Sequence, residues 1–245
     1  MKRILVALML VGAAGMAPSA KAEGPSEGMA LIKKMVEAAK VVKGASYRVQ
    51  VEPIDLGKKF IPHIDATCLT WGFQDNMPKK AKVEMTTKED GASETNRLTL
   101  GAVDDEYYLI DHKTKKAYKD IDPAVLGAMS TAFQVASYVS LLQTEPYKRE
   151  LESKTQEVKG TETVDGVECH VVHVVYGEGP RRSDFYIAKK DHLARKIDLI
   201  WMENEEGKGG VVITYTDLKT DPKLKDGAFA FKLPEGFEQS DDYAP

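Results

Sequence analysis

Residues 27–43 have the apolar spacing of an amphipathic helix. Their apolar side chains share one helical face, while lysines and a glutamate occupy the other. Ser26 stands where an N-cap is expected, and Gly44 is suited to end the helix. The pattern predicts a helix over 27–43 that packs on another element through Leu31, Ile32, Met35, Val36, Ala39 and Val42.

From Tyr47 onward the period changes to two. Apolar and polar residues alternate over 47–52 and 81–86, and similar runs occupy 64–73, 94–100, 105–111, 166–176, 183–188, 193–203 and 210–218. Turn residues such as Asp90-Gly91 and Asp165-Gly166 separate the runs. About ten short strands joined mostly by hairpins predict one antiparallel sheet, because parallel strands would need crossover connections. The alternation also predicts one dry face and one wet face.

One segment interrupts the strand pattern. No charged residue occurs between Asp122 and Glu145, and Asp122-Pro123 suits the start of a helix. A helix that is apolar nearly all round is either buried or in contact with a hydrophobic ligand. A membrane span is the third alternative, but serine, threonine and glutamine residues interrupt the segment. We therefore expect a central apolar helix here.

The N-terminus has the features of a secretory signal. Lys2 and Arg3 precede an uncharged apolar run over 4–17, and Ala20 and Ala22 form the small-residue pattern of a cleavage site. The run is shorter than the roughly 20 residues that span a bilayer, although an uncut anchor is the alternative. We expect a signal peptide over 1–22, a periplasmic location, no membrane-integral segment after processing, and a single domain over 23–245.

Charge and motifs exclude several classes of function. The 34 Lys and Arg against 38 Asp and Glu give a net charge of −4, which argues against a nucleic-acid partner. No hydrolase, protease or nucleotide-binding motif occurs, and the stretch from Cys169 to His173 offers too few ligands for zinc. We expect no catalytic residues, cofactor or metal, and we interpret Arg181-Arg182 as a solvated turn. Cys68 and Cys169 form either one disulfide or two buried free thiols.

Three segments together carry a family resemblance. Residues 161–172 have the pattern of two strands joined by a Val-Asp-Gly turn, and residues 185–196 end in Leu-Ala-Arg-Lys. Residues 229–237 contain the motif Phe-x-Phe-x-x-Pro-x-Gly. In this order, behind a signal and an amphipathic helix, they resemble periplasmic proteins of the LolA-like superfamily, most of all an uncharacterised lipoprotein-sorting-type branch. The resemblance implies a mainly β fold of the α+β class: a curved, incomplete antiparallel β-barrel with helices on its concave apolar side. It also implies a hydrophobic cavity in place of catalytic groups.

Two functions follow as hypotheses. The first is a carrier that holds a lipid, an acyl chain or a lipoprotein in the cavity; the second is a sensory or partner-binding module that contacts another cell-envelope protein. No position matches a cargo-gating residue of the lipoprotein carrier. Large apolar side chains would line such a cavity, and for each of them core packing is the alternative. The candidate lining residues are Trp71, Met85, Leu126, Met129, Phe133, Val139, Tyr186 and Trp201.

Overall fold

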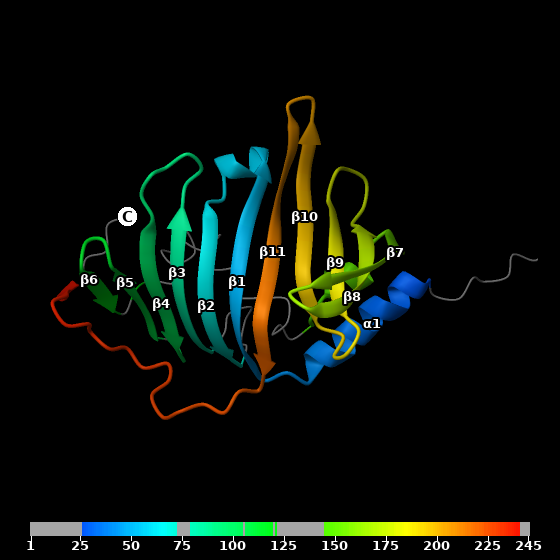
Figure 1. The fold of residues 1–245 in the computed structure, drawn as a ribbon. Coiled ribbons are helices and arrows are strands. Elements are labelled where there is room, and N and C mark those ends of the chain that lie inside the picture. Colours follow the sequence, from blue (N-terminus) through cyan, green and yellow to red (C-terminus); the bar gives the residue numbers. More distant parts are fainter. Residues whose placement is uncertain (1–25, 73–78, 105, 120, 122–144, 241–245) are drawn as a thin grey trace, which may run out of the picture.

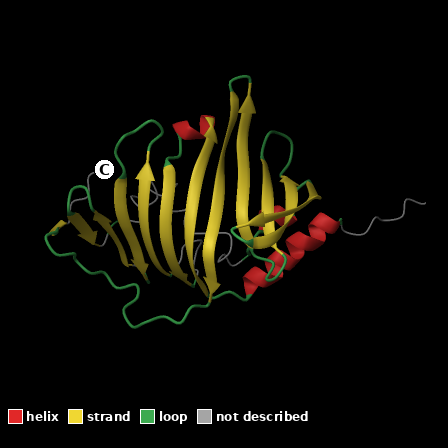
Figure 2. Cartoon of the chain, viewed as in Figure 1, coloured by secondary structure: helices red, strands yellow, loops and turns green. Residues whose placement is uncertain are grey.

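The computed structural model describes residues 26–72, 79–104, 106–119, 121 and 145–240. Within them, twelve strands form one open, curved sheet in the order β12-β6-β5-β4-β3-β2-β1-β11-β10-β9-β8-β7 (Figures 1 and 2). The strands are β1 (Gly44–Asp55), β2 (His63–Trp71), β3 (Lys80–Lys88), β4 (Asn96–Val103), β5 (Glu106–Asp111), β6 (Lys116–Lys119), β7 (Thr155–Val164), β8 (Val167–Val175), β9 (Arg182–Ala188), β10 (Ala194–Asn204), β11 (Gly207–Thr220) and β12 (Glu238–Ser240). The helices are α1 (Glu27–Lys40), a 3-10 turn η1 (Leu56–Lys59) and α5 (Lys148–Leu151).

The pairing confirms the expected antiparallel sheet, with one difference. Every neighbouring pair is antiparallel except β12, which runs parallel to β6. The short strand β6 was also not predicted from the alternation. The parallel pair arises because the chain after β11 passes along the sheet and returns beside β6 (Figure 1).

Helix α1 confirms the predicted N-terminal helix but ends at Lys40. The Ser26 hydroxyl accepts a hydrogen bond from the Met29 amide at 3.1 Å, as an N-cap should. Gly44 opens β1 instead of ending the helix. The Asp221 carboxylate, just after β11, accepts hydrogen bonds from the amides of Lys43 and Gly44 at 2.8 and 3.1 Å. A tertiary contact therefore fixes where the helix gives way to the strand.

The two faces of the sheet differ in what covers them. We call the face against which α1 packs the inner face; it carries Val49, Val83 and Met85, all at most 2% exposed. The opposite, outer face carries polar residues such as Arg48 and Asp65, which form an ion pair at 2.5 Å. Apolar clusters on the outer face occur at two places, described below. The sheet is therefore dry on one side and only locally dry on the other.

The two cysteines lie on opposite faces. Cys68 is on the inner face of β2, Cys169 is on the outer face of β8, and four strands separate β2 from β8. Neighbouring strands lie about 4.8 Å apart, whereas a disulfide requires Cα atoms within about 7 Å. Both cysteines are buried thiols that form no disulfide, and burial raises the pKa of Cys68 to about 12.

Candidate functional site

An accessible apolar strip runs along the inner face of β10. Ile197, Leu199 and Trp201 are half-buried there and pack against the main core. Their cross-strand neighbours are more deeply buried: Ile197 pairs with Ile213 and with Phe185, and Leu199 pairs with Val211. We call Ile197, Leu199 and Trp201 the β10 stripe. It is a place where inner-face apolar side chains remain in reach of solvent.

A polar cluster borders the β10 stripe. Tyr176, just beyond β8, donates its hydroxyl to Glu150 Oε1 at 2.8 Å and lies 3.2 Å from Ser183 Oγ. The guanidinium carbons of Arg149 and Arg181 lie 5.7 and 5.4 Å from the centre of the Tyr176 ring. We call these five residues the tyrosine cluster. Ser183 pairs directly with Leu199 across β9 and β10, so the cluster adjoins the stripe.

The electrostatics of the tyrosine cluster are dominated by burial. Burial raises the pKa of the Tyr176 phenol well above its usual range, and the Glu150 carboxylate adds to this effect. Burial also lowers the pKa of Arg181, and the positive charge of Arg149 lowers it further. The Arg181 Nε is buried, and no acceptor among the described residues binds it. The cluster thus holds two guanidinium groups beside one carboxylate.

The sequence analysis did not identify this cluster. The interpretation of Arg181-Arg182 as a solvated turn is wrong for both residues. Arg182 opens β9 on the outer face and pairs with Glu203 Oε2 at 2.8 Å. Arg181 is partly buried over Tyr176. Strand alternation could have predicted this difference. If the strand pattern from Ser183 is extended toward the N-terminus, Arg182 and Arg181 fall on opposite faces of the sheet.

The candidate lining residues divide between the two faces. Met85 and Trp201 lie on the inner face, Met85 within the sealed core and Trp201 on the β10 stripe. Trp71 and Tyr186 lie on the outer face, so the structure does not bring them to the surface formed by the other two. The central candidates lie outside the described residues: Leu126, Met129, Phe133 and Val139.

Local packing explains why Trp71 and Tyr186 face outward. Trp71 lines an outer pocket with residues of the C-terminal segment. Tyr186 packs in a small outer cluster with Cys169 and Val171, donates its hydroxyl to Asp198 Oδ2 at 3.0 Å, and has the Lys196 ammonium 4.2 Å from its ring centre. Each large side chain is covered without reaching the inner face.

The C-terminal segment covers part of the outer face. We call residues 224–237 the C-terminal strap; its Phe231 and Phe237 pack on Tyr108 and Ile110 of β5. The Tyr108 hydroxyl donates to the Phe229 carbonyl at 3.2 Å, and its ring centre lies 5.3 Å from that of Phe231. Of the Phe-x-Phe motif, Phe231 thus anchors the strap through its ring and Phe229 through its main-chain carbonyl.

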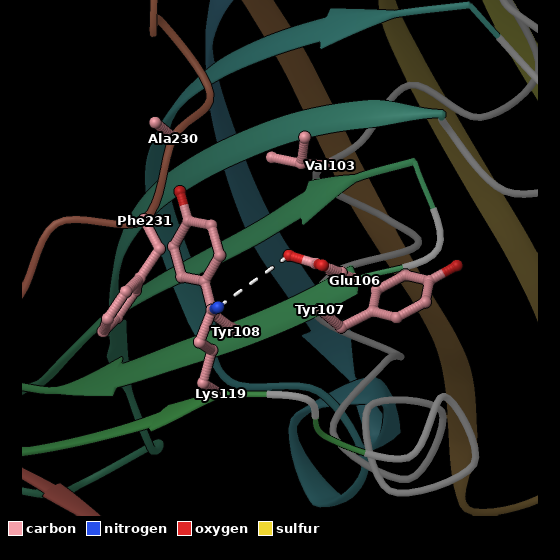
Figure 3. Close-up of a pocket in the computed structure, with 7 residues that line it drawn as sticks. All are labelled: Val103, Glu106, Tyr107, Tyr108, Lys119, Ala230 and Phe231. Carbon is pink, nitrogen blue, oxygen red and sulfur yellow. Dashed lines mark ion pairs between the residues drawn. The ribbon is translucent and has the colours of Figure 1, made fainter.

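Three pockets lie along the strap. The pocket in Figure 3, of about 270 Å³, lies between β5 and Phe231, and Lys119 pairs with Glu106 across its edge at 3.9 Å. In the same view the Tyr108 ring points toward Phe231, while the Tyr107 ring points away from it. The others, of about 380 and 310 Å³, are lined by charged side chains around Arg97 and by Trp71, respectively. Ala230 of the strap lines all three, so they are gaps beneath the strap.

The described residues form neither a metal site nor a membrane-spanning helix. No group of three or more histidine, cysteine, aspartate or glutamate side chains is placed there to hold a metal ion. Within the same residues, none of the helices has the length and apolarity to cross a membrane.

Comparisons with known proteins support the fold. A family model described as a predicted periplasmic protein (DUF2092) matches residues 97–240, and no curated protein matches the sequence. LprF from Mycobacterium bovis superposes with a TM-score of 0.52 at 11% identity, over 85% of this chain and 100% of LprF. This superposition confirms the LolA-like fold expected from the sequence.

Two further solved structures are more distant. The lipoprotein LppX of Mycobacterium tuberculosis has a TM-score of 0.46 at 16% identity, over 81% of this chain and 97% of LppX. A chain of the Pseudomonas aeruginosa MucA/MucB complex has a TM-score of 0.45 at 13% identity, over 84% of this chain. This protein spans only 62% of that relative.

Proposed function

Because this chain belongs to the DUF2092 family of predicted periplasmic proteins, we propose that it is a non-catalytic periplasmic binding protein that holds an apolar ligand on the inner face of its sheet. The family confirms the periplasmic location expected from residues 1–22. The ligand class we propose is a lipid, an acyl chain or the acyl part of a lipoprotein. The β10 stripe carries the proposal, because it exposes three apolar side chains in a row beside the deeply buried residues of the inner face.

The energetics of such a surface are favourable for an acyl chain. Each methylene removed from water contributes about 0.8 kcal/mol. A chain that buries about ten methylenes therefore gains about 8 kcal/mol before the cost of immobilisation is subtracted. The half-buried side chains of Leu199 and Trp201 gain burial at the same time. The acyl part of such a ligand requires no charged or reactive group from the protein.

The second hypothesis, binding of an envelope protein, can use either a helix or an available sheet edge. Strand β7 is one end of the sheet, and residues 159–163 along it are exposed. A bulge between Val158 and Gly160 disrupts this edge, and Glu157 and Lys159 place an ion pair on it. Bulges and charges are the features by which proteins block strand addition. The β7 edge therefore favours partner binding less than the β10 stripe favours an apolar ligand.

Replacing Leu199 by asparagine tests the binding surface. We expect Leu199→Asn to weaken the binding of palmitate by about tenfold to a hundredfold, because about 1.5–3 kcal/mol of apolar contact is lost. Displacement of a fluorescent fatty acid measures the affinity. The matched control is Ile200→Asn, since Ile200 is the next residue on the same strand and faces outward opposite Gly210. Equal affinities of the two variants for palmitate would contradict the proposed surface.

A further inference from the structure

We infer that the tyrosine cluster binds the anionic headgroup of an amphiphile, a carboxylate or a phosphate, whose acyl chain lies on the β10 stripe. This inference rests on the proposed function and specifies the ligand class for the same inner surface. The residues that would bind the headgroup are Arg149 and Arg181. They lie beside the β10 stripe, where β8 ends and β9 begins.

The charges of the cluster are not balanced. Glu150 is its one carboxylate, and the Tyr176 hydroxyl already donates to it. The basic residues nearby in the sequence are paired elsewhere: Lys148 with Glu145 at 2.9 Å and Lys154 with Glu178 at 2.5 Å. Among the described residues, neither Arg149 nor Arg181 has a carboxylate within ion-pair distance, whereas Arg182 has one. The cluster therefore carries one excess positive charge at the border of an apolar strip.

The geometry of the cluster favours an anionic oxygen over other ligands. The buried Nε of Arg181 is a hydrogen-bond donor for which the described residues supply no acceptor. A guanidinium presents a planar set of donors that matches the oxygens of a carboxylate or a phosphate. The Tyr176 ring lies beneath both guanidinium groups and holds them by cation–π contact. An anionic group would satisfy the free donor and offset the repulsion between the two arginines.

The position of the cluster relative to the stripe defines how the amphiphile lies. Ser183, a member of the cluster, pairs with Leu199, and Phe185 pairs with Ile197. A headgroup at the arginines thus places the first methylenes at Leu199, which lies between Ile197 and Trp201 on the β10 stripe. The other positively charged pocket, around Arg97, is on the outer face, and there Lys82 pairs with Glu84 at 2.7 Å. Of these two sites, the tyrosine cluster is the one that adjoins the β10 stripe.

Ligands with one chain and different headgroups test the inference. Palmitate carries a carboxylate, palmitoyl lysophosphatidate carries a phosphate, and monopalmitoylglycerol has no charge. We expect Arg181→Gln to weaken palmitate and lysophosphatidate by about tenfold or more, as for loss of a charge-assisted hydrogen bond, while monopalmitoylglycerol binds within about twofold of wild type. Arg149→Gln, on the exposed side of α5, should act in the same direction without risk to folding. Arg182→Gln, next in the chain and paired with Glu203, is the matched control and should leave all three affinities unchanged.

The outcomes separate the inference from the proposed function. If wild type binds all three ligands and neither Arg149→Gln nor Arg181→Gln discriminates between them, the headgroup site is refuted while the apolar surface stands. An equal loss for all three ligands would assign the arginines a structural role and would also refute it. If wild type binds none of the three, the proposed function itself fails. A loss confined to lysophosphatidate or to palmitate supports the site and identifies its headgroup as phosphate or carboxylate.

Discussion

Replacing Tyr108 by alanine is expected to lower the free energy of unfolding by about 3–5 kcal/mol, because a large buried ring leaves a cavity. Tyr108 is 4% exposed, and its ring and hydroxyl anchor Phe231 and the Phe229 carbonyl. The variant should also release the C-terminal strap from the outer face. Urea unfolding measures the first effect, and limited proteolysis between residues 224 and 237 measures the second. Stability and proteolysis like those of wild type would contradict the anchoring role.

Gly101 provides an independent test of the same contact. Gly101 pairs with Tyr108, and a β-carbon at Gly101 would lie 1.9 Å from Cζ of the ring. Gly101→Ala should therefore destabilise the wild-type protein by about 1–3 kcal/mol through overpacking. In the Tyr108→Ala background the ring is absent, so the same substitution should cost almost nothing. Additive effects of the two substitutions would show that they do not share this contact.

Met85→Ala is the second substitution with a large expected effect. Met85 is 2% exposed on the inner face and belongs to the main core, so we expect a loss of about 2–5 kcal/mol in the free energy of unfolding. Leu199→Ala, on the half-buried stripe, should cost less than half as much, because fewer packed neighbours are lost. Urea denaturation of both variants makes the comparison. A cost at Leu199 equal to that at Met85 would contradict the distinction between sealed core and open stripe.

Alternation predicted the strands but not which face each large side chain would occupy. Alternation shows which residues of a strand share a face with Trp71 or with Tyr186, but it does not show which face is the inner one. In both β2 and β9 this choice is ambiguous, because apolar residues occur on both faces. Large aromatic residues were assigned to the inner face because that face was expected to be the dry one. On the outer face the C-terminal strap lies beside Trp71, and Tyr186 packs with residues of β7 and of its paired neighbour β8. No local pattern encodes such coverage.

Tertiary contacts also determine where helix α1 ends and how the tyrosine cluster forms, so neither could be predicted from the local sequence. The Asp221 carboxylate receives the amides of Lys43 and Gly44 from the far end of β11, so the helix ends before the position that its apolar spacing suggested. The packing of α5 beside the end of β8 brings Arg149 to Tyr176. As a result Arg149 and Arg181, which are far apart in the sequence, both lie over the Tyr176 ring. The fold class followed from periodicity and from the family resemblance, whereas the site required the register of β9 with β10.

Quenching of single tryptophans by brominated palmitate tests the central claim most directly. The chain has two tryptophans, and the structure places Trp201 on the inner stripe and Trp71 on the outer face. In the Trp71→Phe variant, brominated palmitate should quench Trp201 with saturation, because bromine quenches only at near contact. In the Trp201→Phe variant, Trp71 should keep its fluorescence under the same conditions. Saturable quenching of Trp71 alone, or of neither tryptophan, would contradict an acyl-binding surface on the inner face of β10.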